Sequence, residues 1–193
     1  MKLLLATLAL AWTTAHAQFQ VGLKPGFFPR QASAVVSVPF ITGQTAGTPQ
    51  SGAGSDNVGF LFRVGSAALT VTDVGVFRQS GDNNTSISAH ISSVTGGTLY
   101  ATATIDLTAG SAGSFVYAPV TPVVLSANTT YVATFRDTGK WYDSNSTITH
   151  TADATVPNAT YSANPISGIT DFNANANGGT DHAYGFVNFK YHL

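Results

Sequence analysis

The sequence has no cysteine, no glutamate after residue 17, and few charged residues of any kind. Without cysteine, packing and hydrogen bonds must hold the fold together. Charged residues make up 9% of the 193 residues, against roughly 25% in an ordinary globular domain. There is no basic patch to bind nucleic acid and no cluster of cations to bind anionic lipid. The weakly charged surface also lacks the repulsion that discourages self-association.

The first 17 residues have the features of a secretory signal peptide. Lys2 precedes the apolar run 3–12, and Ala15-His16-Ala17 places small residues where a signal peptidase reads them. The run is too short to cross a bilayer as a helix, which needs about 20 residues, and no later segment is long and apolar enough. We therefore expect cleavage after Ala17, export without a membrane span, and a location outside the cell or on its surface. Export of a chain without cysteine favours a bacterial source.

Short segments of alternating apolar and polar residues, separated by Gly, Ser, Asn and Asp, run through most of the chain. This pattern is typical of antiparallel β-structure, and no segment after the signal peptide has a helical period. The sequence predicts an all-β fold, an antiparallel two-sheet sandwich of jelly-roll type. The alternation puts Phe60, Phe62, Phe115 and Tyr117 on the core face. The predicted strands are residues 34–41, 58–64, 69–76, 87–91, 99–107, 113–117, 130–135 and 183–191.

The expected organisation is a signal peptide (1–17), an N-terminal strand and loop (18–57), and a sandwich core (58–193), with 18–193 forming one domain. Composition predicts a loop over 43–57 and long surface loops over 136–182. The N-terminal strand allows two interpretations. We prefer that it folds back as the first strand of the chain's own sandwich; the alternative is that it completes a neighbour's sheet.

Several segments resemble an uncharacterised β-sandwich module of exported bacterial proteins, often appended to larger extracellular proteins that include glycoside hydrolases. The family has a pattern like "GQTLGT…VGxxFTVG…LTVTALG…WYD", and this chain has Thr72-Asp73-Val74 where "TAL" is usual. The resemblance implies a β-sandwich fold and no site residues. It is carried by residues 39–48, 58–65, 69–75, 113–117, 122–131, 141–143 and 187–191.

The short motif Trp141-Tyr142-Asp143 is the first candidate for a binding site. An exposed aromatic pair can stack on the face of a pyranose ring, and a neighbouring carboxylate can accept hydrogen bonds from its hydroxyls. The alternative is structural, because Trp and Tyr often cover the end of a sandwich core with their polar groups in solvent. The motif predicts contact with polysaccharide if its rings are exposed.

The loop 79–86 is the second candidate, because Asp82, Asn83 and Asn84 lie together in it. Asn, Asp and Gly accept positive φ, so the structural interpretation is a hairpin turn. The functional interpretation is a polar rim for sugar hydroxyls or for one Ca²⁺, which needs several oxygen ligands. Asp82 is the sole carboxylate of the loop, which weakens the calcium interpretation. No other cofactor is expected.

The remaining titratable residues give no catalytic or metal-binding motif. His90, His150, His182 and His192 are scattered, without metal-ligand spacing. No serine lies in a nucleophile elbow. We therefore expect no enzyme activity, and the residual alternative is a hydrolase with two paired carboxylates. The aspartates available for such a pair are Asp73, Asp106, Asp137, Asp143, Asp153, Asp171 and Asp181.

Two functional hypotheses follow. The first is a non-catalytic secreted or cell-surface module that binds polysaccharide or another matrix component through residues 141–143 and the 79–86 loop. The second is a structural protein that assembles with itself into an extracellular matrix or fibre. Low charge and the N-terminal strand support the second hypothesis.

Overall fold

The computed structural model describes residues 35–50, 57–80, 85–95, 97–136, 142–144, 146–162 and 179–193. The expected signal peptide lies outside the described residues. Within them, a short 3-10 turn, η1 (Leu107–Ala109), accompanies the strands. The strands are β1 (Val38–Pro39), β2 (Ile41–Thr45), β3 (Thr48–Gln50), β4 (Asn57–Val64), β5 (Leu69–Arg78), β6 (Ser86–Ser93), β7 (Leu99–Asp106), β8 (Ser114–Leu125), β9 (Thr130–Arg136), β10 (Tyr142–Ser144), β11 (Ser146–His150), β12 (Ala154–Ser162), β13 (His182–Ala183) and β14 (Val187–His192).

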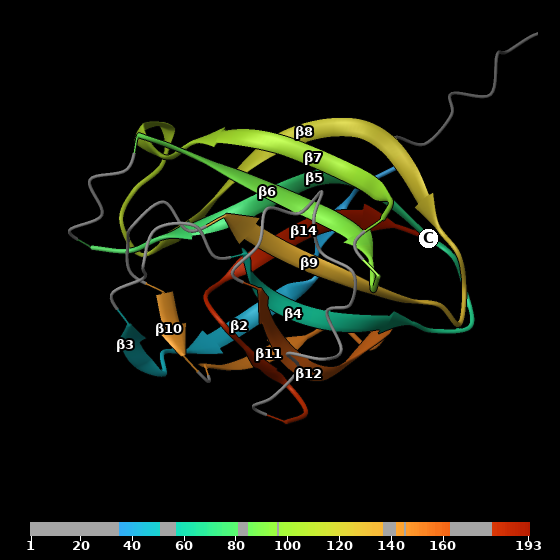
Figure 1. Cartoon of the computed structure of the whole chain (residues 1–193). Coiled ribbons are helices and arrows are strands. Elements are labelled where there is room, and N and C mark those ends of the chain that lie inside the picture. Colours follow the sequence, from blue (N-terminus) through green and yellow to red (C-terminus); the bar gives the residue numbers. More distant parts are fainter. Residues whose placement is uncertain are drawn as a thin grey trace, which may run out of the picture. The chain divides into compact units, whose positions relative to one another are not determined.

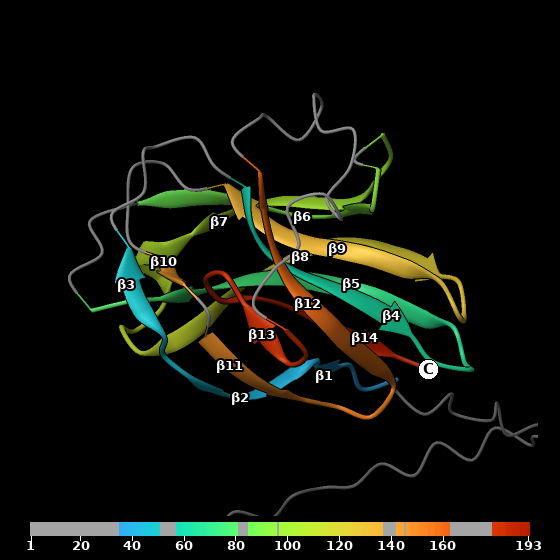
Figure 2. The ribbon, with the colours of Figure 1, turned by 60° about the horizontal axis from the view of Figure 1, so that its bottom comes forward.

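Two large antiparallel sheets pack against each other (Figure 1). The four-stranded sheet has the order β1-β14-β5-β8, and the five-stranded sheet has the order β12-β4-β9-β6-β7. A smaller sheet, β13-β11-β2, lies beside them, and Figure 2 shows its strands together below β12 and β4. The short strands β10 and β3 pair with each other.

The order of pairing along the chain is that of a jelly roll. β6 pairs with β7, β5 with β8, β4 with β9 and β2 with β11, so each pair encloses the previous one in the sequence. A long hairpin rolled onto itself has this nested pairing. β14 is added between β1 and β5. The predicted all-β antiparallel sandwich of jelly-roll type is confirmed.

A cluster of phenylalanines lies at the centre of the core. The Phe40 ring stacks on Phe189, with ring centroids 4.8 Å apart and an interplanar angle of 8°. Phe60 and Phe62 of β4 pack against Phe40 from the other sheet, with centroids 6.0 Å and 5.9 Å away. All four side chains are fully buried. The cluster therefore joins the first described strands, the last strand and the opposite sheet.

The N-terminal strand lies in the chain's own sandwich. Val38 and Pro39 pair with Tyr191 and Lys190 of β14, and β2 pairs with β11. Because Phe40 lies between these two strands and is buried in the core, this segment is an integral part of the fold.

Two segments that composition predicts to be loops contain strands instead. β2 extends into 43–57 and β3 lies within it, and β10, β11 and β12 lie within 136–182. These strands are short or rich in Thr and Asn, which hides the alternation. In β12, a register shift between Thr155 and Asn158 also breaks the period of two.

The predicted core face of β8 is wrong by one residue. Val116, opposite Val76 of β5, is buried in the core. Since successive side chains of a strand point to opposite faces, Phe115 and Tyr117 lie on the outer face of the four-stranded sheet. The sequence did not decide between the faces because residues 115–118 are all apolar or aromatic.

We expect Phe40→Ala to lower the free energy of unfolding by about 3–5 kcal/mol, because it leaves a cavity among three buried rings. Val36→Ala is the matched control, since Val36 is 75% exposed, and we expect a change within about 0.5 kcal/mol. Urea denaturation of both variants measures this. Equal stabilities of the two variants would contradict the central position of Phe40.

Candidate functional site

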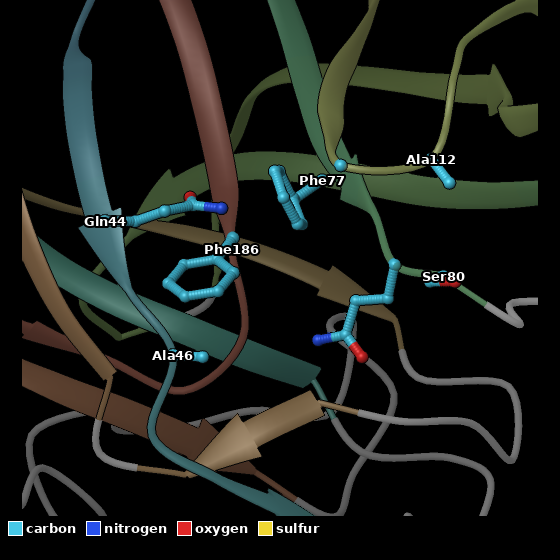
Figure 3. A pocket seen from close by; sticks show the side chains of 8 residues that line it. Gln44, Ala46, Phe77, Ser80, Ala112 and Phe186 are labelled. Atoms are coloured by element: carbon cyan, nitrogen blue, oxygen red, sulfur yellow. The ribbon is translucent and has the colours of Figure 1, made fainter.

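An open groove of about 720 Å³ lies between the end of β2 and the end of β5. Its volume is within the usual range of ligand sites, roughly 300–1,000 Å³. Figure 3 shows Gln44 and Ala46 on one side of the groove, Phe186 in the middle, and Phe77, Ser80 and Ala112 on the other side. Gln79 and Gly113 complete the lining.

Two aromatic rings form the apolar part of the groove. Phe77 of β5 and Phe186 meet edge to face, with centroids 5.5 Å apart and an interplanar angle of 77°. Phe186 is buried, whereas Phe77 is partly exposed. The backbone N–H of Phe77 donates to the Phe186 carbonyl at 2.9 Å, which fixes the two residues side by side. Phe77 is therefore the ring that is open to the groove.

Gln44 supplies the polar group of the groove. Its backbone is held in β2 opposite Ile148 of β11. Its Oε1 atom is buried and has no hydrogen-bond partner in the described part of the protein. Buried polar atoms in proteins are almost always paired. The oxygen is closed off from the groove as the side chain stands, and rotation of the amide would turn this acceptor toward a ligand with a hydroxyl or amide donor.

Arg78 fixes the far wall of the groove. Its guanidinium Nη1 donates to the Gly110 carbonyl, and its own carbonyl accepts the Gly113 N–H at 2.8 Å. Gly113 has φ of 83°, a conformation that favours glycine. Asp106 stabilises the same turn, because its carboxylate accepts from the Thr108 hydroxyl at 2.6 Å and from the Thr108 N–H at 2.9 Å. These two hydrogen bonds lower the pKa of Asp106. Arg78 thus holds this wall, although its charged guanidinium does not line the groove.

A row of aromatic rings continues from the groove along the outer face of the four-stranded sheet. Phe115 meets Phe77 edge to face at 5.4 Å, and Tyr117 follows Phe115 at 6.0 Å. All three rings are partly buried. We call Phe77, Phe115 and Tyr117 the aromatic row.

Tyr117 lies across Gly75 at the end of the aromatic row. A Cβ atom on Gly75 would come within 2.5 Å of Tyr117 Cδ1, so the ring needs glycine beneath it. The Asn188 amide donates to the Tyr117 hydroxyl at 2.7 Å, and Lys190 Nζ stands 4.4 Å from the ring centroid. Burial, and to a lesser extent the charge of Asp73, raises the pKa of Tyr117, although the bond from Asn188 opposes this. The phenol is therefore neutral at physiological pH.

None of the described titratable groups lines the groove, and several of them contact other parts of the protein. His150 has Nε2 3.0 Å from Asp181 Oδ1 and Nδ1 2.7 Å from the Thr151 carbonyl, so both ring nitrogens face acceptors. Asp153 accepts from the Tyr191 hydroxyl. His90 contacts the Thr102 hydroxyl at 2.8 Å, and burial is the main cause that lowers its pKa. Among the described residues, no group of three or more His or Asp side chains could hold a metal ion.

The predicted site residues fall mostly outside the described residues. Trp141, Asp82, Asn83 and Asn84 lie outside them. The backbone of Tyr142 and Asp143 forms β10 and pairs with Gln50 and Pro49 of β3. β3 begins two residues after Ala46 of the groove. The predicted 79–86 loop begins with Gln79 and Ser80, which line the groove.

Six residues of the groove were not predicted as site residues from the sequence: Gln44, Ala46, Phe77, Ala112, Gly113 and Phe186. Gln44 lies in a segment predicted to be a loop. Phe77 extends a predicted strand by one residue, and the phenylalanine after an alternating run is the signal that could have identified it. Nothing in the sequence near Phe186 points to a site.

Comparison with family models, curated proteins and solved structures found no match for this chain. In the described residues, no helix has the length and apolar character needed to cross a membrane. The groove and the aromatic row are therefore the features of the chain that bear on its function.

We expect Gly75→Ala to displace the Tyr117 ring and to lower the free energy of unfolding by about 1–3 kcal/mol, because the added methyl group overlaps the ring and the Val116 carbonyl. Gly43→Ala is the control, since its Cβ would meet Thr149 at an ordinary 3.6 Å. Thermal and urea unfolding of the two variants measures this. A Gly75→Ala protein as stable as Gly43→Ala would mean that Tyr117 does not rest on Gly75.

Proposed function

We propose that this chain is a non-catalytic, exported module that binds polysaccharide in the groove. The observation that carries the proposal is a partly exposed ring, Phe77, in the same groove as the side-chain amide of Gln44, whose oxygen has no protein partner. A sugar has an apolar C–H face that packs on an aromatic ring and hydroxyls at its edge that donate hydrogen bonds.

The lining of the groove supports a role without catalysis. It consists of glutamine, serine, alanine, glycine and phenylalanine, and none of these groove residues is an acid, a base or a histidine. General acid–base catalysis requires a titratable group within hydrogen-bond reach of the reacting atom. Ser80, the groove's hydroxyl, has no histidine beside it in the lining. Binding is what this set of side chains supports.

The sequence supports export. The run 3–12 followed by Ala15-His16-Ala17 is that of a signal peptide, and polysaccharide is abundant in the compartment to which such a chain is sent. Trp141 remains a predicted contact of the same ligand, because the strand that follows it pairs with β3 next to the groove.

Self-assembly is the second candidate function, and exposed valines favour it. Val35 and Val36, just before the outer strand β1, are 67% and 75% exposed, and Val38 within β1 is 42% exposed. Such residues could pack against a second copy. Strand-to-strand assembly, however, needs free backbone N–H groups along an outer strand.

Proline opposes assembly at the outer strands of both large sheets. β1 contains Pro39, β8 contains Pro119 and Pro122, and β12 contains Pro157. Proline has no N–H to donate and is typical of edges that must not pair. The fourth outer strand, β7, lies beside β8, as Figure 1 shows. These features favour the binding function over assembly.

We expect Phe77→Ala and Gln44→Leu each to weaken polysaccharide binding at least about tenfold, because one removes the ring and the other removes the buried acceptor. The measurement is affinity electrophoresis of residues 18–193 in gels that contain galactomannan, hydroxyethylcellulose, dextran, alginate or polygalacturonate. Leu99→Ala, at a side chain 46% exposed on β7, is the control, and thermal unfolding checks that each variant is folded. A wild-type protein that no gel retards, or variants retarded like wild type, would contradict the proposed site.

We expect residues 18–193 to be monomeric at all concentrations, because three of the four outer strands of the two large sheets carry proline. Multi-angle light scattering over a concentration series measures the mass. A mass that grows with concentration and returns to one chain in Val36→Asp would favour self-assembly. A chain that starts at Val35 is the suitable truncation, since removing residues up to 41 would also remove the buried Phe40.

A further inference from the structure

We infer that the glycan extends beyond the groove along the aromatic row to a second contact formed by Tyr117, Lys190 and Asp73, and that it is a neutral polysaccharide. This inference rests on the proposed function and adds the ligand class and the direction of the bound chain.

The aromatic row connects the groove to the second contact without a gap. Phe77 lines the groove, Phe115 is 5.4 Å from it, and Tyr117 is 6.0 Å from Phe115. These three residues lie on the outer face of the sheet, because their neighbours Val76 and Val116 point into the core. Aromatic residues partly exposed in a row on an outer face need a reason, since the outer positions of a sandwich strand are normally polar. An extended ligand along the row supplies that reason.

Polar groups of both kinds stand at the end of the row. Lys190 of β14 is directly opposite Asp73 of β5, and Pro39 and Pro119 flank the pair on the neighbouring strands. The Lys190 ammonium lies over the Tyr117 ring. Asp73 Oδ2 accepts from the Thr72 hydroxyl at 2.7 Å. A ring next to one donor and one acceptor matches a sugar, whose hydroxyls both donate and accept.

The charges of the second contact favour a neutral ligand. Lys190 and Asp73 carry opposite charges, and among the described residues they do not form an ion pair within 4.0 Å. The groove lining is uncharged. A uronic acid carboxylate attracted to Lys190 would be repelled by Asp73 directly opposite, and an amino-sugar ammonium attracted to Asp73 would be repelled by Lys190. Uncharged hydroxyls can use both side chains without repulsion.

The Tyr117 ring of the second contact is fixed before a ligand binds. Tyr117 rests on Gly75, and its hydroxyl is held by Asn188, which is itself fully buried. A ring that is already fixed loses little conformational entropy on binding, which preserves affinity. The Lys190 ammonium lies over this ring, so the long side chain must move aside before a sugar can stack on it.

The test compares ligand length, charge and salt. Calorimetry measures binding of residues 18–193 to galactomannan and hydroxyethylcellulose, to a disaccharide and a hexasaccharide of each, and to polygalacturonate. We expect Lys190→Gln and Asp73→Asn each to weaken binding of the neutral polymer and its hexasaccharide roughly three- to tenfold and to leave the disaccharide unchanged. Arg63→Gln is the matched control for loss of a charge, because Arg63 is exposed on the opposite sheet. Wild-type affinity for the neutral polymer should not change between about 0.01 M and 1 M sodium chloride.

Each outcome separates the two proposals. Loss of binding in Phe77→Ala with no effect of Lys190→Gln or Asp73→Asn would leave the groove as the site and overturn the second contact. Tighter binding of polygalacturonate, weakened by salt, would overturn the neutral ligand. Absence of binding to every probe, or binding that Phe77→Ala does not change, would overturn the proposed function and this inference with it.

Discussion

The stack of Phe40 on Phe189 is the contact on which the rest of the structure depends. It brings the first described strands against the last strand at the centre of the core, with ring centroids 4.8 Å apart. Because Phe40 is buried there, the chain must turn between β1 on the four-stranded sheet and β2 on the small sheet. That turn carries Gln44 and Ala46 to the side opposite Phe77. The groove therefore exists because one buried ring divides the N-terminal strand between two sheets.

Asn188 couples this turn to the outer face. Its Oδ1 accepts the Ile41 N–H at 2.8 Å and the Phe189 N–H at 2.8 Å, and its Nδ2 donates to the Ile41 carbonyl at 3.1 Å and to the Tyr117 hydroxyl at 2.7 Å. A side-chain amide offers two acceptor and two donor positions, and all four are used. The same buried residue thus holds the start of β2, which leads to the groove, and the ring at the end of the aromatic row. All four hydrogen bonds of this amide are made, so displacing Ile41 or Tyr117 would break at least one of them. The positions of Ile41 and Tyr117 are therefore coupled through Asn188.

The sequence predicts those parts of the fold in which the two faces of a strand differ. Leu69–Val76 alternates because one face is buried, and its pairing and burial follow. Val58–Val64 is correctly predicted as a strand, but it is buried on both faces apart from Arg63. The core face of β8 could not be predicted, because Phe115, Val116 and Tyr117 are apolar or aromatic on both faces. Pairing with β5, which places Val116 opposite Val76, determines which side chains face the core. The site was predicted in part: the 79–86 loop begins at the groove, but Gln44 and Phe186 reach it from segments far away in the sequence. A groove assembled by tertiary packing leaves no local pattern.

Low charge links the surface of this protein to its site. Charged side chains near the groove would hold water strongly, and removing that water would oppose the packing of an uncharged sugar on Phe77. The groove lining carries no charge, and the polar ends of Lys190 and Asp73 balance each other beyond it. The same low charge weakens the repulsion that keeps copies apart. Prolines in β1, β8 and β12 offset this loss, because they remove the N–H groups that a second copy would need. Under the proposed function, the uncharged groove accepts a neutral sugar, and the outer strands, rather than net charge, prevent association.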